Sequence, residues 1–221
     1  MLVKGEFLLT DDEKVIVSSF ATELLRSRAL GARVFLRSIL ANYLGKPPAK
    51  VEIEIGKFGK PLVIGGPEFN LSHSGQIAAV ALHPSLQVGI DIERCNNEIK
   101  GSDFASILSE NEKRRAIQNP PRNTQWLQMW VRKEAVVKAT GLGLHIDLTT
   151  IDVGFHNDKN STWRKVPVGR DVNCNGGFDH IFLSNLALPH GCLGALAIAS
   201  VSIPPESAEI KTDGFSALHE S

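Results

Sequence analysis

Residues 88–93 read Val-Gly-Ile-Asp-Ile-Glu, and this alternation of apolar and polar residues predicts a β-strand. Because alternate side chains of a strand point to the same face, Asp91 and Glu93 should stand side by side, opposite the apolar side chains. Two adjacent carboxylates repel each other, and a hard divalent cation with oxygen ligands would compensate them best. The same alternation also fits a strand whose polar face is simply solvated, so this stretch alone leaves both interpretations open.

Residues 130–138 read Trp-Val-Arg-Lys-Glu-Ala-Val-Val-Lys and predict part of a helix. At roughly 100° per residue, Glu134 and Lys138 fall on the same stripe as Leu127 and Trp130. The carboxylate and the lysine should therefore face protein or a cleft rather than bulk water. The alternative is an exposed i,i+4 ion pair, which stabilises a helix by about 0.2–0.5 kcal/mol and has no chemical role.

The composition of the chain excludes several classes of protein. Its 221 residues allow one large domain or two small ones, and 43% hydrophobic with 22% charged residues is typical of a soluble globular protein. The net charge of zero provides no basic field for nucleic acid. No apolar run is long enough to span a bilayer, and the three cysteines form neither a metal spacing nor a disulfide framework. We therefore expect a cytoplasmic protein without membrane or nucleic-acid partners.

The order of predicted elements suggests an internal duplication. A helical period runs from residue 11 to about 44, and Gly45 should end it. The remaining predicted elements are helices over 104–117 and 125–140 and strands over 51–55, 62–64, 76–83, 88–93, 152–155, 162–168, 181–188 and 194–201. Two halves with similar helix-then-strand order predict an α+β fold of two pseudo-duplicated lobes, residues 1–87 and 88–203. The tail, residues 204–221, should be poorly ordered.

Five sequence blocks, taken in order, resemble a known enzyme family. They are Gly59-Lys60-Pro61, Phe69-Asn70-Leu71-Ser72-His73-Ser74, the stretch 88–93, Ser109-x-x-Glu112, and Trp130-x-x-Lys133-Glu134-x-x-x-Lys138-x-x-Gly141. Together they resemble the 4′-phosphopantetheinyl transferases of the surfactin-synthetase-activating (Sfp) type, over roughly residues 28–144. The resemblance implies the two-lobed fold of that family and a monomer.

The resemblance also implies a reaction. Such enzymes transfer the phosphopantetheine arm of coenzyme A to a serine of an apo acyl, polyketide or peptidyl carrier protein and release adenosine 3′,5′-bisphosphate. They require Mg²⁺, with Mn²⁺ as an alternative. By motif position, Asp91, Glu93 and Glu134 resemble the metal ligands, and Asp91 counts as catalytic through the metal. Glu134 also resembles the base that deprotonates the attacking serine, and Lys138 the lysine on the leaving phosphate.

Contacts to coenzyme A are implied for several further residues. Ser72 and His73 resemble the pair that holds its phosphates, and Lys60 the lysine near the nucleotide. Basic residues of the first helix should bind the 3′-phosphate; Arg28 is selected here, and the other candidates are Lys14, Arg26, Arg33 and Arg37.

Four positions around the second helix complete these expectations. Lys133 is assigned with Lys138 to coenzyme A, although Arg132 and Lys133 could instead meet an acidic carrier protein. Trp130 should be a core residue that anchors the helix. Ser109 and Glu112 have the spacing of a capping box, which gives Glu112 a structural role.

Two other classes of protein compete with the transferase. One is a non-catalytic module that binds a carrier protein or a nucleotide, and the presence of Asp91, Glu93, Glu134 and Lys138 together argues against it. The other is a different magnesium-dependent phosphoryl-transfer enzyme or a nuclease. Neutral net charge and few aromatic residues near basic ones argue against a nucleic-acid substrate.

Overall fold

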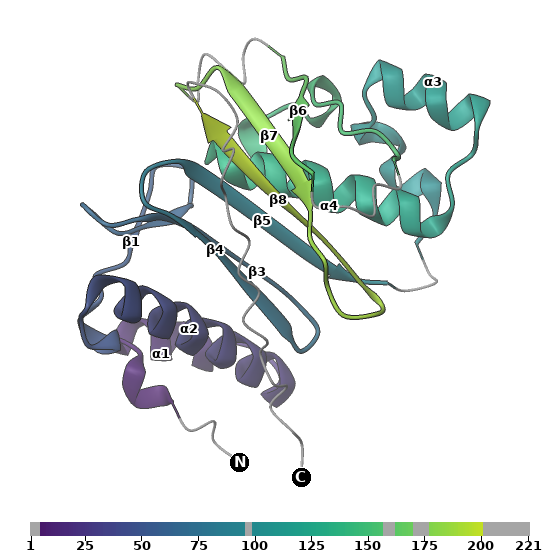
Figure 1. The fold of residues 1–221 in the computed structure, drawn as a ribbon. Helices are drawn as coiled ribbons and strands as arrows, with labels where there is room; N and C mark the ends of the chain where they lie inside the picture. The colour runs from purple at the N-terminus through teal and green to yellow at the C-terminus, as the bar shows by residue number, and fades with distance from the viewer. Residues whose placement is uncertain (1–4, 96–98, 157–161, 170–176, 201–221) are drawn as a thin grey trace.

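The computed structural model describes residues 5–95, 99–156, 162–169 and 177–200, which form an α+β fold (Figure 1). Two helices near the N-terminus lie along a two-stranded hairpin, and a longer helix lies across a four-stranded antiparallel sheet. The expected tail, residues 204–221, falls outside the described residues. Within the described part, no helix is both long and apolar enough to cross a membrane.

The N-terminal helical region contains two helices, α1 (Asp11–Ser18) and α2 (Glu23–Leu44). The expectation of one continuous helical stretch is therefore wrong at residues 19–22. Thr22 explains the break, because its side chain accepts a hydrogen bond from the Leu25 amide and so begins a new helix. Gly45 ends α2 with φ of 64°, as predicted, in the left-handed conformation that glycine adopts without steric cost.

Four short strands follow α2. The strands β1 (Glu54–Ile55) and β2 (Pro61–Leu62) form a small hairpin, so the predicted strands over 51–55 and 62–64 are much shorter than expected. The strands β3 (Glu68–Ser74) and β4 (Ile77–His83) form a longer hairpin. The sequence did not predict β3 as a separate strand, because its polar residues obscure the apolar alternation on which strand prediction relies.

The larger sheet has the strand order β5-β8-β7-β6, with every pair antiparallel. Its strands are β5 (Gln87–Arg94), β6 (Arg164–Val166), β7 (His180–Asn185) and β8 (Cys192–Ser200), at positions close to those predicted. The predicted strand over 152–155 is wrong, because only an isolated bridge between Ile151 and Val168 forms there. The amides of residues 153 and 154 instead donate to the Glu112 carboxylate.

The region before the long helix is also divided. A 3₁₀ segment, η3 (Gly101–Ile107), is followed by α3 (Glu110–Gln118) and α4 (Asn123–Thr140). The predicted continuous helix over 104–117 is wrong because Ser109 begins α3 with the expected capping box to Glu112. Gly141 ends α4 as predicted, with φ of 68°. Further 3₁₀ turns lie at Glu6–Leu8, Pro48–Lys50, Gly143–His145 and Leu148–Thr150.

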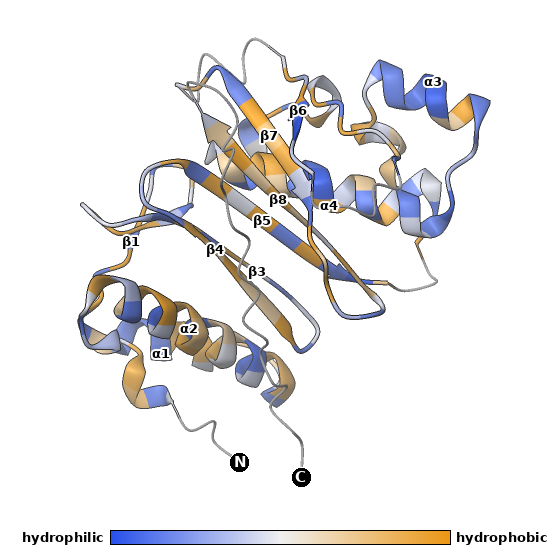
Figure 2. Ribbon diagram, viewed as in Figure 1, coloured by the Kyte–Doolittle hydropathy of each residue, from blue (hydrophilic) through white to orange (hydrophobic). Residues whose placement is uncertain are grey.

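The main hydrophobic core lies between α4 and the larger sheet, and Figure 2 shows the hydrophobic character of β7 and β8 there. Gly89 of β5 permits this packing at its closest point. A Cβ atom at residue 89 would lie 2.1 Å from both the Ala135 carbonyl oxygen and the Ala139 amide nitrogen. Glycine thus lets the backbone of α4 approach β5 directly, which brings the side chains of α4 close to the β5 carboxylates.

Candidate active site

The site lies at the junction between the two sheets, where β3 runs beside β5 without forming a backbone ladder with it. Polar side chains of β3 replace the missing backbone bonds. Asn70, Ser72 and Ser74 accept hydrogen bonds from three β5 amides, those of Ile90, Ile92 and Arg94, at 2.9, 3.1 and 3.1 Å. This junction joins the hairpin to the larger sheet through side chains.

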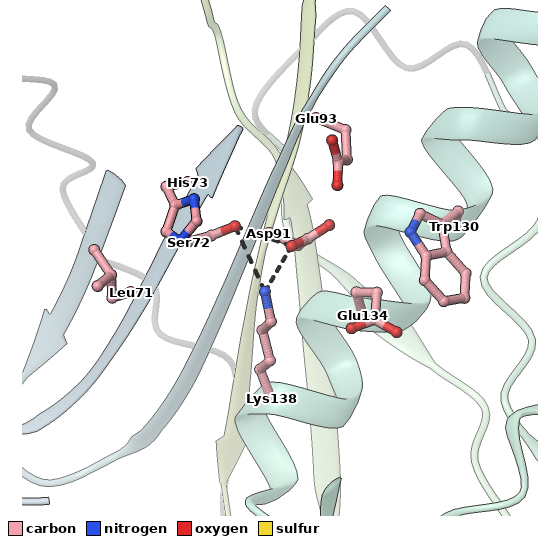
Figure 3. Close-up of a pocket in the computed structure, with 8 residues that line it drawn as sticks. All are labelled: Leu71, Ser72, His73, Asp91, Glu93, Trp130, Glu134 and Lys138. Carbon is pink, nitrogen blue, oxygen red and sulfur yellow. Dashed lines mark hydrogen bonds and ion pairs between the residues drawn. The ribbon is translucent and has the colours of Figure 1, made fainter. Parts of the chain in front are cut away.

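A pocket of about 250 Å³ opens at this junction (Figure 3). Three elements that lie far apart in the sequence supply its walls. The lining residues are Leu71, Ser72 and His73 from β3, Asp91 and Glu93 from β5, and Trp130, Glu134 and Lys138 from α4. The alternation of β5 and the stripe of α4 therefore direct these groups into one pocket.

Asp91 is the most constrained acid of the pocket, with an exposed fraction of 5%. Its Oδ1 accepts from the Lys138 ammonium at 2.6 Å and from the Ser72 hydroxyl at 3.0 Å. Its Oδ2 is buried and has no hydrogen-bond partner among the described residues. Burial raises the pKa of Asp91, and the nearby Lys138 and Ser72 partly oppose that rise.

Glu134 lies half-buried one helical turn before Lys138, but the two do not form the i,i+4 pair. No ion pair within 4.0 Å joins them among the described side chains, and the Lys138 ammonium reaches across to Asp91 instead (Figure 3). The interpretation as an exposed helix-surface pair is therefore wrong. Burial raises the pKa of Glu134, the negative charge of Asp91 raises it further, and Lys138 opposes both.

The three carboxylates fit a hard divalent cation in their chemistry, although they are not assembled as a ligand set. Asp91, Glu93 and Glu134 line the same pocket, and Lys138 is the only lysine among the residues that line it. The unpartnered Oδ2 of Asp91 is an oxygen for which the protein provides no donor. However, no three acidic, histidine or cysteine side chains of the described chain lie close enough to hold a metal. The predicted convergence on one ion therefore stays a prediction.

Lys133 does not face the pocket, and its assignment to coenzyme A is wrong. Its side chain is 0% exposed, and its ammonium pairs with the equally buried Glu112 at 2.8 Å. It also donates to the carbonyl oxygens of Leu148 and Ile151. Adjacent positions of a helix point in directions about 100° apart, so Lys133 enters the core while Glu134 lines the pocket.

Arg132 is likewise fully buried, and it cannot meet a carrier protein from this position. Its guanidinium donates to Asn185 and to the carbonyl oxygens of Gly154 and His156. Glu112 has the predicted structural role and a larger one, because it caps α3, pairs with Lys133 and accepts from two loop amides. Trp130 packs against the core as expected, and its other side lines the pocket.

The structural role of Lys133 leads to a testable expectation. Lys133→Met should lower the free energy of unfolding by about 3–5 kcal/mol, because Glu112 would remain as an uncompensated buried charge. The double variant Glu112→Gln/Lys133→Met should recover much of that loss. Chemical denaturation measures both, with the exposed Lys113→Met as the matched control. A normal unfolding free energy combined with weakened coenzyme A binding would restore the original assignment of Lys133.

The remaining predicted ligands of coenzyme A are divided between two pockets. His73 is exposed at the first pocket, whereas Ser72 is buried and bonded to Asp91. Lys60 lines a second pocket of about 270 Å³, formed by the loop before β2 and the end of α4. Its ammonium donates to the Val88 carbonyl at 3.0 Å, and burial lowers its pKa while Glu68 partly opposes this.

The first-helix candidates differ in whether they are already engaged. Arg37 is buried and pairs with Glu13, so it has a structural role. Lys14 and Arg26 form local ion pairs within their own helices. Arg28 lines neither pocket, and its Nε is buried without a hydrogen-bond partner in the part of the chain that is described. Its assignment to the 3′-phosphate stays a prediction.

Three residues with evident roles at the site were not assigned from the sequence. Asn70 and Ser74 bond β5, and Gly89 admits α4. The alternation of short polar residues at positions 70, 72 and 74 was a usable signal, because such residues share one face of a strand. Gly89 gave no comparable signal, since close approach depends on an element 46 or more residues away.

Comparison with known proteins supports the same class of enzyme. Residues 87–183 match the model of the 4′-phosphopantetheinyl transferase superfamily. The 4′-phosphopantetheinyl transferase HetI of a Nostoc species is 33% identical over 147 residues, covering 62% of this chain and 61% of that protein. The 4′-phosphopantetheinyl transferase gsp of Aneurinibacillus migulanus is 33% identical over 140 residues, covering 61% and 55%. The chain thus spans between 55% and 61% of the length of these two curated relatives.

Among solved structures, the holo-[acyl-carrier-protein] synthase of Thermotoga maritima aligns with 52% of this chain and 64% of its own. The TM-score is 0.41 and the sequence identity 24%, a likeness too low to bear on function.

Proposed function

We propose that this protein transfers 4′-phosphopantetheine from coenzyme A to a serine hydroxyl of an apo acyl, polyketide or peptidyl carrier protein, releasing adenosine 3′,5′-bisphosphate. The supporting observation is the pocket in which Asp91, Glu93, Glu134 and Lys138 meet beside His73, on a chain similar to named phosphopantetheinyl transferases. We further propose an Sfp-type monomer of two related lobes, residues 1–87 and 88–203. Its place would be the cytoplasm, and its partners would include neither nucleic acid nor membrane.

The chemistry of the reaction suits these groups. Attack of an alcohol on a diphosphate develops charge on phosphate oxygens, so catalysis depends mainly on positioning and on cationic stabilisation. Asp91, Glu93 and Glu134 would hold Mg²⁺ or Mn²⁺, which when bound neutralises the diphosphate. Lys138 would place its charge, or a proton, at the oxygen that leaves with adenosine 3′,5′-bisphosphate.

Glu134 is the proposed general base for the carrier serine. A carboxylate accepts a proton more readily as its pKa approaches the working pH, and burial together with Asp91 raises the pKa of Glu134 in that direction. Lys138 is turned toward Asp91, so it leaves the Glu134 carboxylate without an ion-pair partner on its own helix. The two α4 residues can therefore act at different atoms of one reaction.

The proposal is tested by incubating an apo carrier protein with coenzyme A, Mg²⁺ and the purified protein. Mass spectrometry should show the gain of one phosphopantetheine on the carrier and the formation of adenosine 3′,5′-bisphosphate. A panel of apo acyl, polyketide and peptidyl carriers identifies which kind is used. Absence of modification across the panel, with a known transferase active in parallel, would contradict the proposal and favour a binding module.

His73 provides a prediction about coenzyme A binding. His73→Ala should raise the dissociation constant for coenzyme A roughly 10-fold, because a hydrogen bond to a charged phosphate contributes about 1.5 kcal/mol or more. The maximal rate should fall much less, since the proposed role is to hold phosphate. Isothermal titration calorimetry measures the binding, with His83→Ala, at the far end of β4 and outside the pocket, as the matched control. An unchanged dissociation constant would remove His73 from the binding site.

A further inference from the structure

Ser72 and Ser74 repeat one hydrogen-bond arrangement along β3. The hydroxyl of Ser72 accepts from the Ile92 amide at 3.1 Å and donates to Asp91 Oδ1 at 3.0 Å. The hydroxyl of Ser74 accepts from the Arg94 amide at 3.1 Å and donates to Glu93 Oε2 at 2.7 Å. Each serine therefore joins a β5 amide to the carboxylate one residue earlier on β5.

This arrangement fixes the direction of each hydroxyl proton. A serine hydroxyl has a single donor, and an amide that donates to its oxygen favours the rotamer in which the proton points elsewhere. Here the proton points to the carboxylate. Asn70 bonds β5 in the same way through its Oδ1 but donates to no carboxylate there. The junction between β3 and β5 thus contains two rungs that touch an acid and one that does not.

The two serines also determine which carboxylate oxygens are left for a ligand. Asp91 and Glu93 lie on the same face of β5, where their like charges would otherwise turn them apart. At Asp91, the bonds from Ser72 and Lys138 both go to Oδ1, and Oδ2 is left buried without a partner. At Glu93, Ser74 engages Oε2 at the wall of the same pocket.

We propose that Ser72 and Ser74 are positioning residues that orient Asp91 and Glu93 toward a divalent cation and thereby set the affinity of the site for it. The inference rests on the proposed function, since it takes the two carboxylates as cation ligands. It assigns a role to Ser74, and it gives Ser72 a role at Asp91 that does not require contact with coenzyme A. Hydrogen-bond partners of metal-binding carboxylates typically contribute a factor of about 10–100 to metal affinity.

The test measures Mn²⁺ binding to the full chain without coenzyme A, by electron paramagnetic resonance. Ser74→Ala should weaken Mn²⁺ binding by about 10–100-fold. Ser74→Thr keeps a hydroxyl in a strand, where a β-branched residue is accommodated, and should bind Mn²⁺ within a few-fold of the wild type. The Mn²⁺ concentration that half-saturates carrier modification should rise with the dissociation constant, while the KM for coenzyme A changes little.

Asn70→Ala is the matched control, because it removes a rung of the same junction without removing a donor to a carboxylate. Its Mn²⁺ affinity should stay close to wild type even if its melting temperature falls. Equal weakening in Asn70→Ala and Ser74→Ala, or wild-type affinity in Ser74→Ala, would overturn the positioning role. Failure of the wild-type protein itself to bind Mn²⁺ or to modify any carrier would instead contradict the proposed function.

Discussion

Asp91→Ala should reduce the rate of carrier modification by at least about 10³-fold while the protein stays folded. Asp91 is the pocket acid with a buried, unpartnered oxygen, and it is also the partner that holds the Lys138 ammonium in the pocket. Its loss removes a proposed cation ligand and frees the lysine from its observed position. Single-turnover mass spectrometry of the carrier measures the rate, with the exposed Asp12→Ala as the matched control.

The stability of Asp91→Ala separates a catalytic from a structural effect. Burial raises the pKa of Asp91, so the folded protein binds this proton more tightly than the unfolded chain does. Ionisation of Asp91 therefore lowers stability as pH rises above its unfolded pKa near 3.8 and through the raised folded value. Removing the acid removes that cost, which offsets the lost bond to Lys138. A wild-type rate, or a loss of rate explained by unfolding, would contradict the role of Asp91.

Glu134→Gln should lower the maximal rate by a factor of about 10²–10⁴, the usual effect of losing a general base, with a much smaller effect on coenzyme A affinity. Glutamine retains the size of the side chain but cannot accept the serine proton. Lys138→Ala should also lower the maximal rate. If both residues act in one step, the double variant should lose less than the product of the two single losses.

The pH dependence of stability gives a second readout for Glu134. Its pKa is raised above 4.5 in the folded protein, so the ionised carboxylate lowers stability as pH rises through the raised value. The melting temperature of Glu134→Gln should equal or exceed that of the wild type at pH 7. That difference should disappear below about pH 4, where both states of the wild type are protonated. A lower melting temperature at pH 7 combined with an unchanged rate would make Glu134 a structural residue.

The parts of the site that the sequence predicted are those with a regular local period. Strand alternation placed Asp91 and Glu93 on one face, and the helical stripe placed Glu134 and Lys138 in a cleft. The glycines after the two long helices ended them where expected, at residues 45 and 141. These features depend on neighbours within one or two turns or on alternate strand positions, so they are visible in a single sequence.

The errors arise where distant residues decide the outcome. The motif that contains Glu134 also contains Lys133, and only the partner 21 residues earlier, Glu112, shows that this lysine is buried. The strand expected over 152–155 is lost because the same Glu112 binds its amides. The junction between β3 and β5 could not be foreseen as side-chain mediated, since strand pairing depends on tertiary contacts. The division into two equivalent lobes stays a proposal, because the two sheets have two and four strands.

The most direct test of the central claim is anomalous diffraction at the manganese absorption edge from crystals grown with Mn²⁺ and coenzyme A. The claim is that the pocket between β3, β5 and α4 is the catalytic metal site. We expect an anomalous peak roughly 2 Å from carboxylate oxygens of Asp91, Glu93 and Glu134, with the diphosphate of coenzyme A beside it. A Mn²⁺ peak at another place, with coenzyme A bound and this pocket free of metal, would contradict the account.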